Sequence, residues 1–178
     1  MRVITFRRVP LIRTLATVAC AVAVFQGGVV AQNQTRRLAP EFQVKLLDDR
    51  VLSASDIQDH ITVIDFWATW CKPCVAEIPE YNAFHREYRD KGVIFLALAL
   101  DSGKVETVKA AAKRFNIEYP AAAPSGKEMK AIGKVRAFPT TWVIGRDGEI
   151  IREFVGVVTG KQDAIREIVD GLIAEQFK

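Results

Sequence analysis

Two cysteines, Cys71 and Cys74, stand where an apolar segment typical of a buried strand, residues 61–67, gives way to a helical pattern. Cysteines separated by two residues can exchange a disulfide with another molecule. A thiol in the first turn of a helix lies beside backbone N–H groups without intrahelical partners, at the positive end of the helix dipole. This position favours the thiolate, the nucleophilic form of cysteine. The pair is therefore predicted to be a catalytic site.

The first 31 residues differ in composition from the rest of the chain. They hold four arginines and no acidic residue, with an apolar stretch over 15–25, and Val29 and Ala31 fit the small-residue rule for secretory cleavage. We expect residues 1–31 to be a signal peptide. A retained N-terminal membrane anchor is the alternative, although an anchor needs about 20 apolar residues. Either reading puts the domain in the periplasm or at the extracytoplasmic face of the inner membrane.

The charge and cysteine counts change once this leader is set aside. The whole chain has 25 basic and 21 acidic residues, a net charge of +4, whereas the part after residue 31 has 21 of each. This balance gives no support for a nucleic-acid partner. Of three cysteines only Cys71 and Cys74 remain, too few for a disulfide scaffold, so the pair is expected to serve chemistry.

Residues 32–40 are predicted to be a polar linker and residues 41–178 a single α/β domain. Thr159 and Gln162 fit a capping box that opens the last helix. The order of the predicted strands and helices indicates a mixed sheet with helices on both faces. The predicted elements are a hairpin over 42–51, a helical turn over 53–59, strands over 61–67 and 93–100, helices over 71–91, 105–115 and 127–132, a hairpin formed by 141–144 and 149–155, and the final helix.

Four segments together resemble the thioredoxin superfamily, and most closely the exported, often membrane-tethered thiol–disulfide oxidoreductases of the TlpA/ResA type. These segments are Asp65–Cys74, Glu77–Pro79, Phe138–Thr141 and the turn at Asp147 leading to Gly156. The resemblance covers nearly all of residues 40–178. It implies a thioredoxin fold with an N-terminal β-hairpin extension, a redox-active Cys71–Cys74 disulfide, and substrates that are themselves proteins.

Within the cysteine motif, Cys71 is the predicted nucleophile and the more exposed and more acidic thiol. Cys74, one turn deeper, is expected to resolve the mixed disulfide. Lys72 adds a nearby cation that favours the thiolate. Pro73 suits the first turn, where its missing N–H is not needed. The competing interpretations are an inert disulfide and a structural zinc site, but zinc would need two further ligands, for which only two histidines are candidates.

Two carboxylates are candidates for moving the proton of the buried cysteine. Asp65 lies in the middle of an apolar strand, where burial should raise its pKa. The resemblance places this acid beneath the buried cysteine as a proton shuttle. Glu77, three residues after Cys74, matches the acidic residue of the ResA-type motif. The alternative for Glu77 is a solvated carboxylate in a helix, and the sequence leaves the division of roles between the two acids open.

The segment before the predicted strand at 141 matches the cis-proline loop that faces the dithiol in this family. Pro139 is therefore expected to follow a cis peptide bond, leaving the backbone of Phe138 free to pair with an extended substrate. Thr140, beside it, is grouped with the substrate-binding residues, as are Lys72 and Pro73. Trp70 is expected to form part of an apolar rim around Cys71.

The sequence thus predicts an exported enzyme that reduces disulfides of other exported proteins, without a cofactor or metal and as a monomer. The resemblance suggests apocytochrome c or the copper site of a terminal oxidase as targets, and a membrane electron donor that renews the dithiol. Two alternatives remain, a disulfide-forming oxidant of the same fold and a non-enzymatic copper-binding chaperone. A peroxidase would require a Pro-x-x-x-Thr-x-x-Cys motif, whereas Asp65 precedes Cys71 by six residues and no such proline stands before it.

Overall fold

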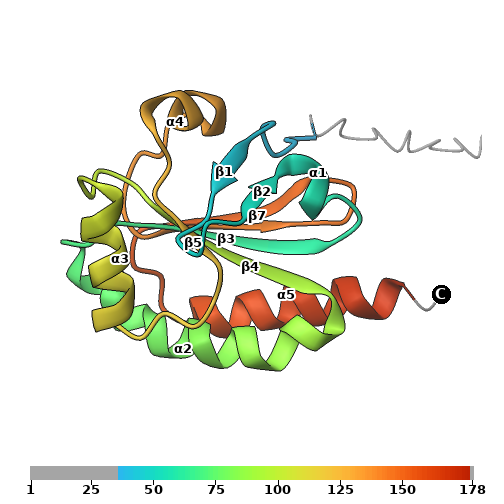
Figure 1. Cartoon of the computed structure of the whole chain (residues 1–178). Helices are drawn as coiled ribbons and strands as arrows, with labels where there is room; N and C mark the ends of the chain where they lie inside the picture. Colours follow the sequence, from blue (N-terminus) through green and yellow to red (C-terminus); the bar gives the residue numbers. More distant parts are fainter. Residues whose placement is uncertain (1–35, 177–178) are drawn as a thin grey trace, which may run out of the picture. The chain divides into compact units, whose positions relative to one another are not determined.

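The computed structural model describes residues 36–176, so the predicted leader, residues 1–31, lies outside the described residues. A five-stranded sheet in the order β5-β4-β3-β6-β7 forms its centre (Figure 1). Its strands are β3 (Ile61–Trp67), β4 (Val93–Ala99), β5 (Ala121–Ala122), β6 (Thr140–Ile144) and β7 (Ile150–Val155). The parallel β3–β4 and β4–β5 pairs and the antiparallel β3–β6 and β6–β7 pairs make the sheet mixed, as predicted.

The other elements cover the sheet. They are β1 (Gln43–Lys45), β2 (Val51–Ser53), α1 (Ala54–Ile57), α2 (Lys72–Tyr88), the 3-10 helix η1 (Arg89–Lys91), α3 (Val105–Arg114), α4 (Gly126–Ile132) and α5 (Lys161–Glu175). The helices α2 and α5 lie together below the sheet in Figure 1, and α3 stands at the end where β3 stops. The antiparallel β1–β2 hairpin, α1 and α4 lie on the opposite side. The predicted N-terminal hairpin and the coverage of both faces are confirmed.

The central strand β3 divides two hydrophobic clusters because successive side chains point to opposite faces of a sheet. One cluster lies between the sheet and the helices α2 and α5. It contains Ile61, Val63 and Trp67 of β3 and also both cysteines. Ile64 and Phe66 belong to the cluster under the hairpin and α4. Every residue of β3 is buried, which explains its near-continuous apolar sequence. By the same alternation Asp65 faces the cluster that contains the dithiol.

The element bounds differ from the predicted ones by a few residues, most at the end of α2, which stops at Tyr88 and is followed by η1, and the cap of α5 also differs. Thr159 was predicted to cap the last helix, and this is wrong: the N-cap of α5 is Gly160, in the left-handed region with φ of 71°, and no side chain caps it. The short strand β5 was not predicted, because two alanines carry no strand periodicity. Pro79 lies inside α2 as expected.

Residues 36–40, the described part of the predicted linker, lie along the turn between β6 and β7 and the start of β7. The N–H of Ala39 donates to the carbonyl of Gly148, and the N–H of Ile150 donates to the carbonyl of Arg37. Leu38 forms an isolated antiparallel bridge with Glu149. Within residues 36–176, no helix is both long and apolar enough to cross a bilayer.

Candidate active site

Cys71 is the N-cap residue of α2, and its sulfur is held by the helix it opens. The backbone N–H of Cys74 donates to Cys71 Sγ over 3.3 Å, in the way a side-chain oxygen serves at an ordinary N-cap. The two cysteines form a disulfide, as the resemblance implied. Both are buried in this oxidised form, Cys71 at 4% and Cys74 at 1% exposure, in the predicted order. A helix N–H aimed at this sulfur favours the thiolate after reduction.

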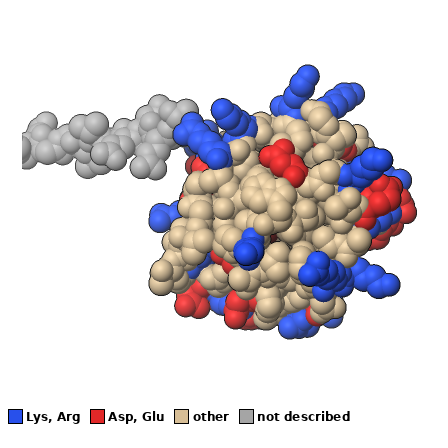
Figure 2. Space-filling model, turned by 90° about the vertical axis from the view of Figure 1, so that its left-hand side faces the viewer, with Lys and Arg blue, Asp and Glu red and all other residues tan. Residues whose placement is uncertain are grey.

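The surface around Cys71 combines exposed polar and aromatic side chains. Lys72 and Pro73 are exposed, and Trp70 is 62% exposed. The indole N–H of Trp70 donates to the carbonyl of Asp101 over 2.9 Å, and its ring meets that of Phe138 edge to face at 5.8 Å. These two contacts hold Trp70 beside the dithiol despite its exposure. Figure 2 shows this end of the molecule as a mostly uncharged surface with Lys and Arg side chains spread around it.

The loop before β6 has the geometry that the resemblance implied. The Phe138–Pro139 peptide bond is cis, and the carbonyl of Pro139 accepts from the N–H of Gly156 over 2.7 Å. Among the described residues, neither the N–H nor the C=O of Phe138 makes a hydrogen bond. An extended peptide could pair with both groups.

Thr140, predicted to be a substrate-binding residue, uses its side chain within the cis-proline loop. Its side chain is only 2% exposed, and its hydroxyl donates to the carbonyl of Ala137 over 2.8 Å. The hydroxyl therefore holds the cis-proline loop, and a part for Thr140 in substrate binding stays a prediction.

Asp65 is the buried acid that the strand pattern predicted. It is 2% exposed, and burial raises its pKa to about 7, an effect opposed by the charge of Lys161 and reinforced by that of Glu77. Thr141 is its cross-strand neighbour on β6, and the hydroxyl of Thr141 donates a hydrogen bond to Asp65 Oδ1 over 3.4 Å. The predicted upward shift of this pKa is confirmed, and Asp65 lies on the face of the sheet that holds the dithiol.

Glu77 is not a solvated helix carboxylate. Its side chain is 12% exposed, and both of its oxygens lie 2.7 Å from Lys161 Nζ. The hydroxyl of Tyr81, one turn further along α2, lies 3.4 Å from Glu77 Oε2. Cys74, Glu77 and Tyr81 recur at helical spacing, so the glutamate shares the face of α2 that carries the buried cysteine.

Lys161 is the site residue that sequence reasoning missed. It is the first residue of α5, is completely buried, and its Nζ also lies 3.4 Å from Thr141 Oγ1. A cation at the positive end of a helix is unfavourable, which was the one signal available that this lysine needed a partner elsewhere.

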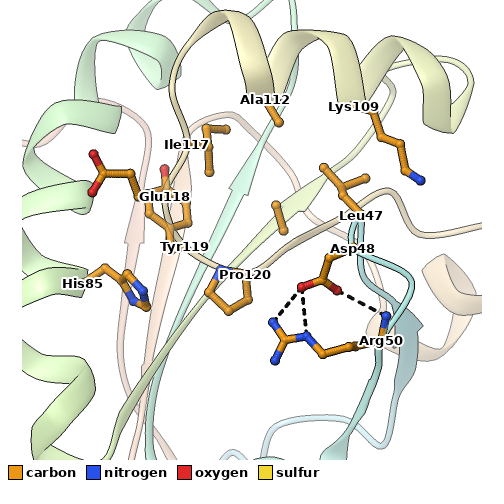
Figure 3. A pocket seen from close by; sticks show the side chains of 11 residues that line it. Leu47, Asp48, Arg50, His85, Lys109, Ala112, Ile117, Glu118, Tyr119 and Pro120 are labelled. Carbon is orange, nitrogen blue, oxygen red and sulfur yellow. Dashed lines mark hydrogen bonds and ion pairs between the residues drawn. The ribbon is translucent and has the colours of Figure 1, made fainter.

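Trp67 and a surface hollow bordered by Asp48, Arg50 and His85 both lie apart from the dithiol and the two acids. Trp67 is buried in the core and packs edge to face against Phe115 at 6.5 Å. The hollow, of about 600 Å³, is bordered by Asp48 and Arg50, which pair with each other, and by His85 (Figure 3). No predicted site residue lines it. Within residues 36–176, no three His, Cys, Asp or Glu side chains come together in a way that could hold a metal ion.

Comparison with known proteins places this geometry in a family. Residues 35–153 match the AhpC/TSA family. The thiol-disulfide oxidoreductase ResA of Bacillus thuringiensis subsp. konkukian is 34% identical over 124 residues, covering 70% of this chain and 71% of that protein. A second ResA, from Bacillus cereus, is 31% identical over 129 residues, covering 72% of this chain and 74% of that one.

A solved structure agrees with these sequence relatives. A crystal structure of a thiol:disulfide interchange protein of the thioredoxin family from Chlorobium tepidum has a TM-score of 0.66 and 25% identity, covering 75% of this chain and 95% of that one. The chain therefore belongs to the AhpC/TSA family, and it is a ResA-like thiol–disulfide oxidoreductase built on the thioredoxin fold.

Proposed function

We propose that this oxidoreductase works outside the cytoplasm and reduces disulfide bonds of other exported proteins. The observation that carries the proposal is the Cys71 sulfur at the N-cap of α2, where the N–H of Cys74 supports a thiolate ready to attack. The leader-like composition of residues 1–31 supports export. The resemblance to ResA-type proteins supports proteins as the substrates.

The reaction is two successive thiol–disulfide exchanges. The Cys71 thiolate attacks one sulfur of the target disulfide, and the other target sulfur leaves as a thiolate that takes a proton. Cys74 then loses its proton and attacks Cys71 Sγ, which closes the 71–74 bridge and releases the second target thiol. The target gains two electrons, which the enzyme loses, and two protons, one from Cys74 and one from solvent, because Cys71 reacts as the thiolate. A membrane thiol donor is proposed to restore the dithiol.

Two carboxylates near the dithiol support the reducing direction. Asp65 and Glu77 lie on the same side of the sheet as Cys74. Their negative charge opposes further thiolate on the buried cysteine, and a less stabilised reduced form is a stronger reductant. We propose apocytochrome c before haem attachment, or the copper site of a terminal oxidase, as the targets suggested by the resemblance.

The Cys74→Ser variant tests the protein-substrate part of this proposal. Without its resolving thiol, the variant should hold target proteins as mixed disulfides through Cys71. They should be recovered from a periplasmic extract and released by dithiothreitol. The Cys71→Ser/Cys74→Ser double variant is the control and should recover none. An empty Cys74→Ser preparation would contradict a protein substrate.

The direction of the reaction is tested separately by the redox potential. The protein is equilibrated with glutathione buffers and its free thiols are trapped by alkylation. We expect a potential nearer to about −270 mV, as for thioredoxin, than to about −120 mV, as for the oxidant DsbA. A value close to the oxidant would overturn the reductase proposal in favour of disulfide formation.

A further inference from the structure

Lys161 is an ammonium group with no exposed surface, held between two acidic side chains. Its Nζ contacts both carboxylate oxygens of Glu77 at 2.7 Å and reaches Asp65 only through the hydroxyl of Thr141, at 3.4 Å from each. A buried charge is costly unless it is paired and hydrogen-bonded. The position of this cation therefore depends on the acids around it.

The charges in this group do not balance. One cation faces two carboxylates, so the pair of acids would carry one uncompensated negative charge in a dry interior if both were ionised. Of the two acids, Lys161 contacts only Glu77 directly. Asp65 is left with a single neutral partner, Thr141, and is the less compensated of the two. Asp65 is therefore the acid that is free to take up and release a proton.

Thr141 connects the two halves of the group. Its oxygen can accept from Lys161 Nζ and from the hydroxyl of Tyr81, which lies 3.0 Å away, while its own hydroxyl donates to Asp65 Oδ1. A hydroxyl has one proton and can accept two hydrogen bonds, so this arrangement uses all of its capacity. The field of the buried ammonium thus acts on Asp65 through a fixed hydroxyl.

We infer that Lys161 is a positioning residue for thiol–disulfide exchange, whose buried ammonium holds Glu77 in an ion pair and so leaves Asp65 as the acid that exchanges a proton with Cys74. In the resolving step the Cys74 thiol gives its proton to the Asp65 carboxylate and its sulfur attacks Cys71 Sγ. Asp65 then passes the proton to the departing target thiolate, so atoms and electrons balance. The inference rests on thiol–disulfide exchange itself and holds in either direction.

Several other groups face Asp65, and their charges are coupled to the pKa of its carboxyl. Burial raises its pKa most, Lys161 lowers it and Glu77 raises it. Tyr81 and Tyr119 feel the charge of Asp65, which helps to raise their own pKa values. These groups are Cys71 at the N-cap of α2, Cys74, Glu77 and Tyr81 within α2, Tyr119 from the segment before β5, Thr141 from β6 and Lys161 from α5.

The test follows the Asp65 carboxyl by carbon-13 NMR in the oxidised protein, where neither cysteine titrates. In Lys161→Met the midpoint should rise by about one pH unit, because a cation that favoured the carboxylate is gone. In Glu77→Gln it should fall, because an anion is gone. The Lys161→Met/Glu77→Gln variant should lie between the two. The exposed Lys113→Met on α3 is the control and should leave the midpoint in place.

A rate measurement separates positioning from a merely structural role. The bridge-closing rate with a small disulfide should fall about fivefold at pH 7 in Lys161→Met and recover at higher pH, because moving the midpoint from about 7 to about 8 lowers the carboxylate fraction at pH 7 from about a half to about a tenth. A structural role would slow exchange equally at every pH and would overturn the inference, as would an unchanged midpoint. If Lys161→Met does not fold, the double variant must still titrate higher than Glu77→Gln. None of these readouts uses a protein substrate or the redox potential.

Discussion

At the scale of single residues, Asp65 links the reaction to the stability of the domain. Its pKa is raised by burial to about 7, whereas an exposed aspartate has a value near 3.8. The folded protein therefore holds this proton to higher pH than the unfolded chain does. The resulting contribution to stability is complete below about pH 4 and is lost as the pH rises through about 7.

Asp65→Asn should remove this pH dependence. The neutral amide has no charge to desolvate, so the variant should be more stable than the wild type by roughly 2 to 4 kcal/mol at pH 8 and similar to it at pH 4. Urea unfolding of the oxidised proteins at both values measures the difference. Parallel stability curves for the two proteins over this range would show that Asp65 is not the buried acid that titrates.

Whether a residue of the site could be predicted from the sequence depends on how far along the chain its partners lie. Cys71, Cys74 and Asp65 could be predicted because their chemistry depends on the strand and helix that carry them. Lys161 could not, because its partner Glu77 is 84 positions away and only the packing of α5 on α2 joins them. The inward direction of the Thr140 hydroxyl could not be predicted either, because the sequence does not say which way a side chain beside a cis proline turns.

At the scale of elements, the two helices that build the site begin in different ways. α2 begins with the Cys71 sulfur accepting a backbone N–H. α5 begins with Gly160 in the left-handed region and has no side-chain cap. A residue with a Cβ is strained in that region. The glycine thus lets the chain turn and brings the next residue, Lys161, into the interior.

Gly160→Ala should destabilise the protein by about 1 kcal/mol, although its Cβ would meet no neighbouring atom. Gly171, inside α5 and equally uncrowded, provides the matched control: Gly171→Ala should stabilise by about 0.5 to 1 kcal/mol. Thr159→Ala should have little effect. Thermal unfolding of the three variants measures these differences. A larger loss for Thr159→Ala than for Gly160→Ala would restore the predicted capping box.

The hydrophobic periodicity of the sequence and its turn residues predicted most helices and strands of this fold. The exceptions are β5 and the start of α5, which depend on features that periodicity does not encode. The buried strands β3 and β4 and the helices α2, α3 and α5 carry long, regular patterns, so their existence could be predicted. β5 has two alanines and exists only because β4 offers it an edge. The helix start at Gly160 depends on a backbone angle that the spacing of Thr159 and Gln162 does not encode.

At the scale of the whole molecule, the sheet separates a reactive half from a supporting half. Adjacent residues of β4 illustrate the division. Phe95 packs against Tyr81 and Tyr119, with ring centres 4.8 and 4.6 Å apart, in the cluster that contains the dithiol. Leu96, its neighbour, lies in the cluster beneath the β1–β2 hairpin.

Phe95→Ala and Leu96→Ala should therefore have similar costs in stability but different effects on exchange. Each should lose roughly 2 to 5 kcal/mol in urea unfolding. Only Phe95→Ala should change the pH profile of exchange under conditions where both variants are folded, because Tyr81 loses its support. If the pH profiles of exchange shifted equally in the two variants, the two faces of the sheet would not differ in their effect on the reaction.

The segment over 36–40 has a consequence for how the molecule meets its surroundings. It occupies the start of β7, the outermost strand on that side of the sheet, where unpaired backbone groups would otherwise attract strands from neighbouring molecules. The bridge that these residues make with β7 lowers the tendency of this edge to pair with strands of other molecules. With this edge covered, the unpaired backbone of Phe138, whose ring contacts Trp70, is a separate place where the proposed polypeptide substrate could add a strand.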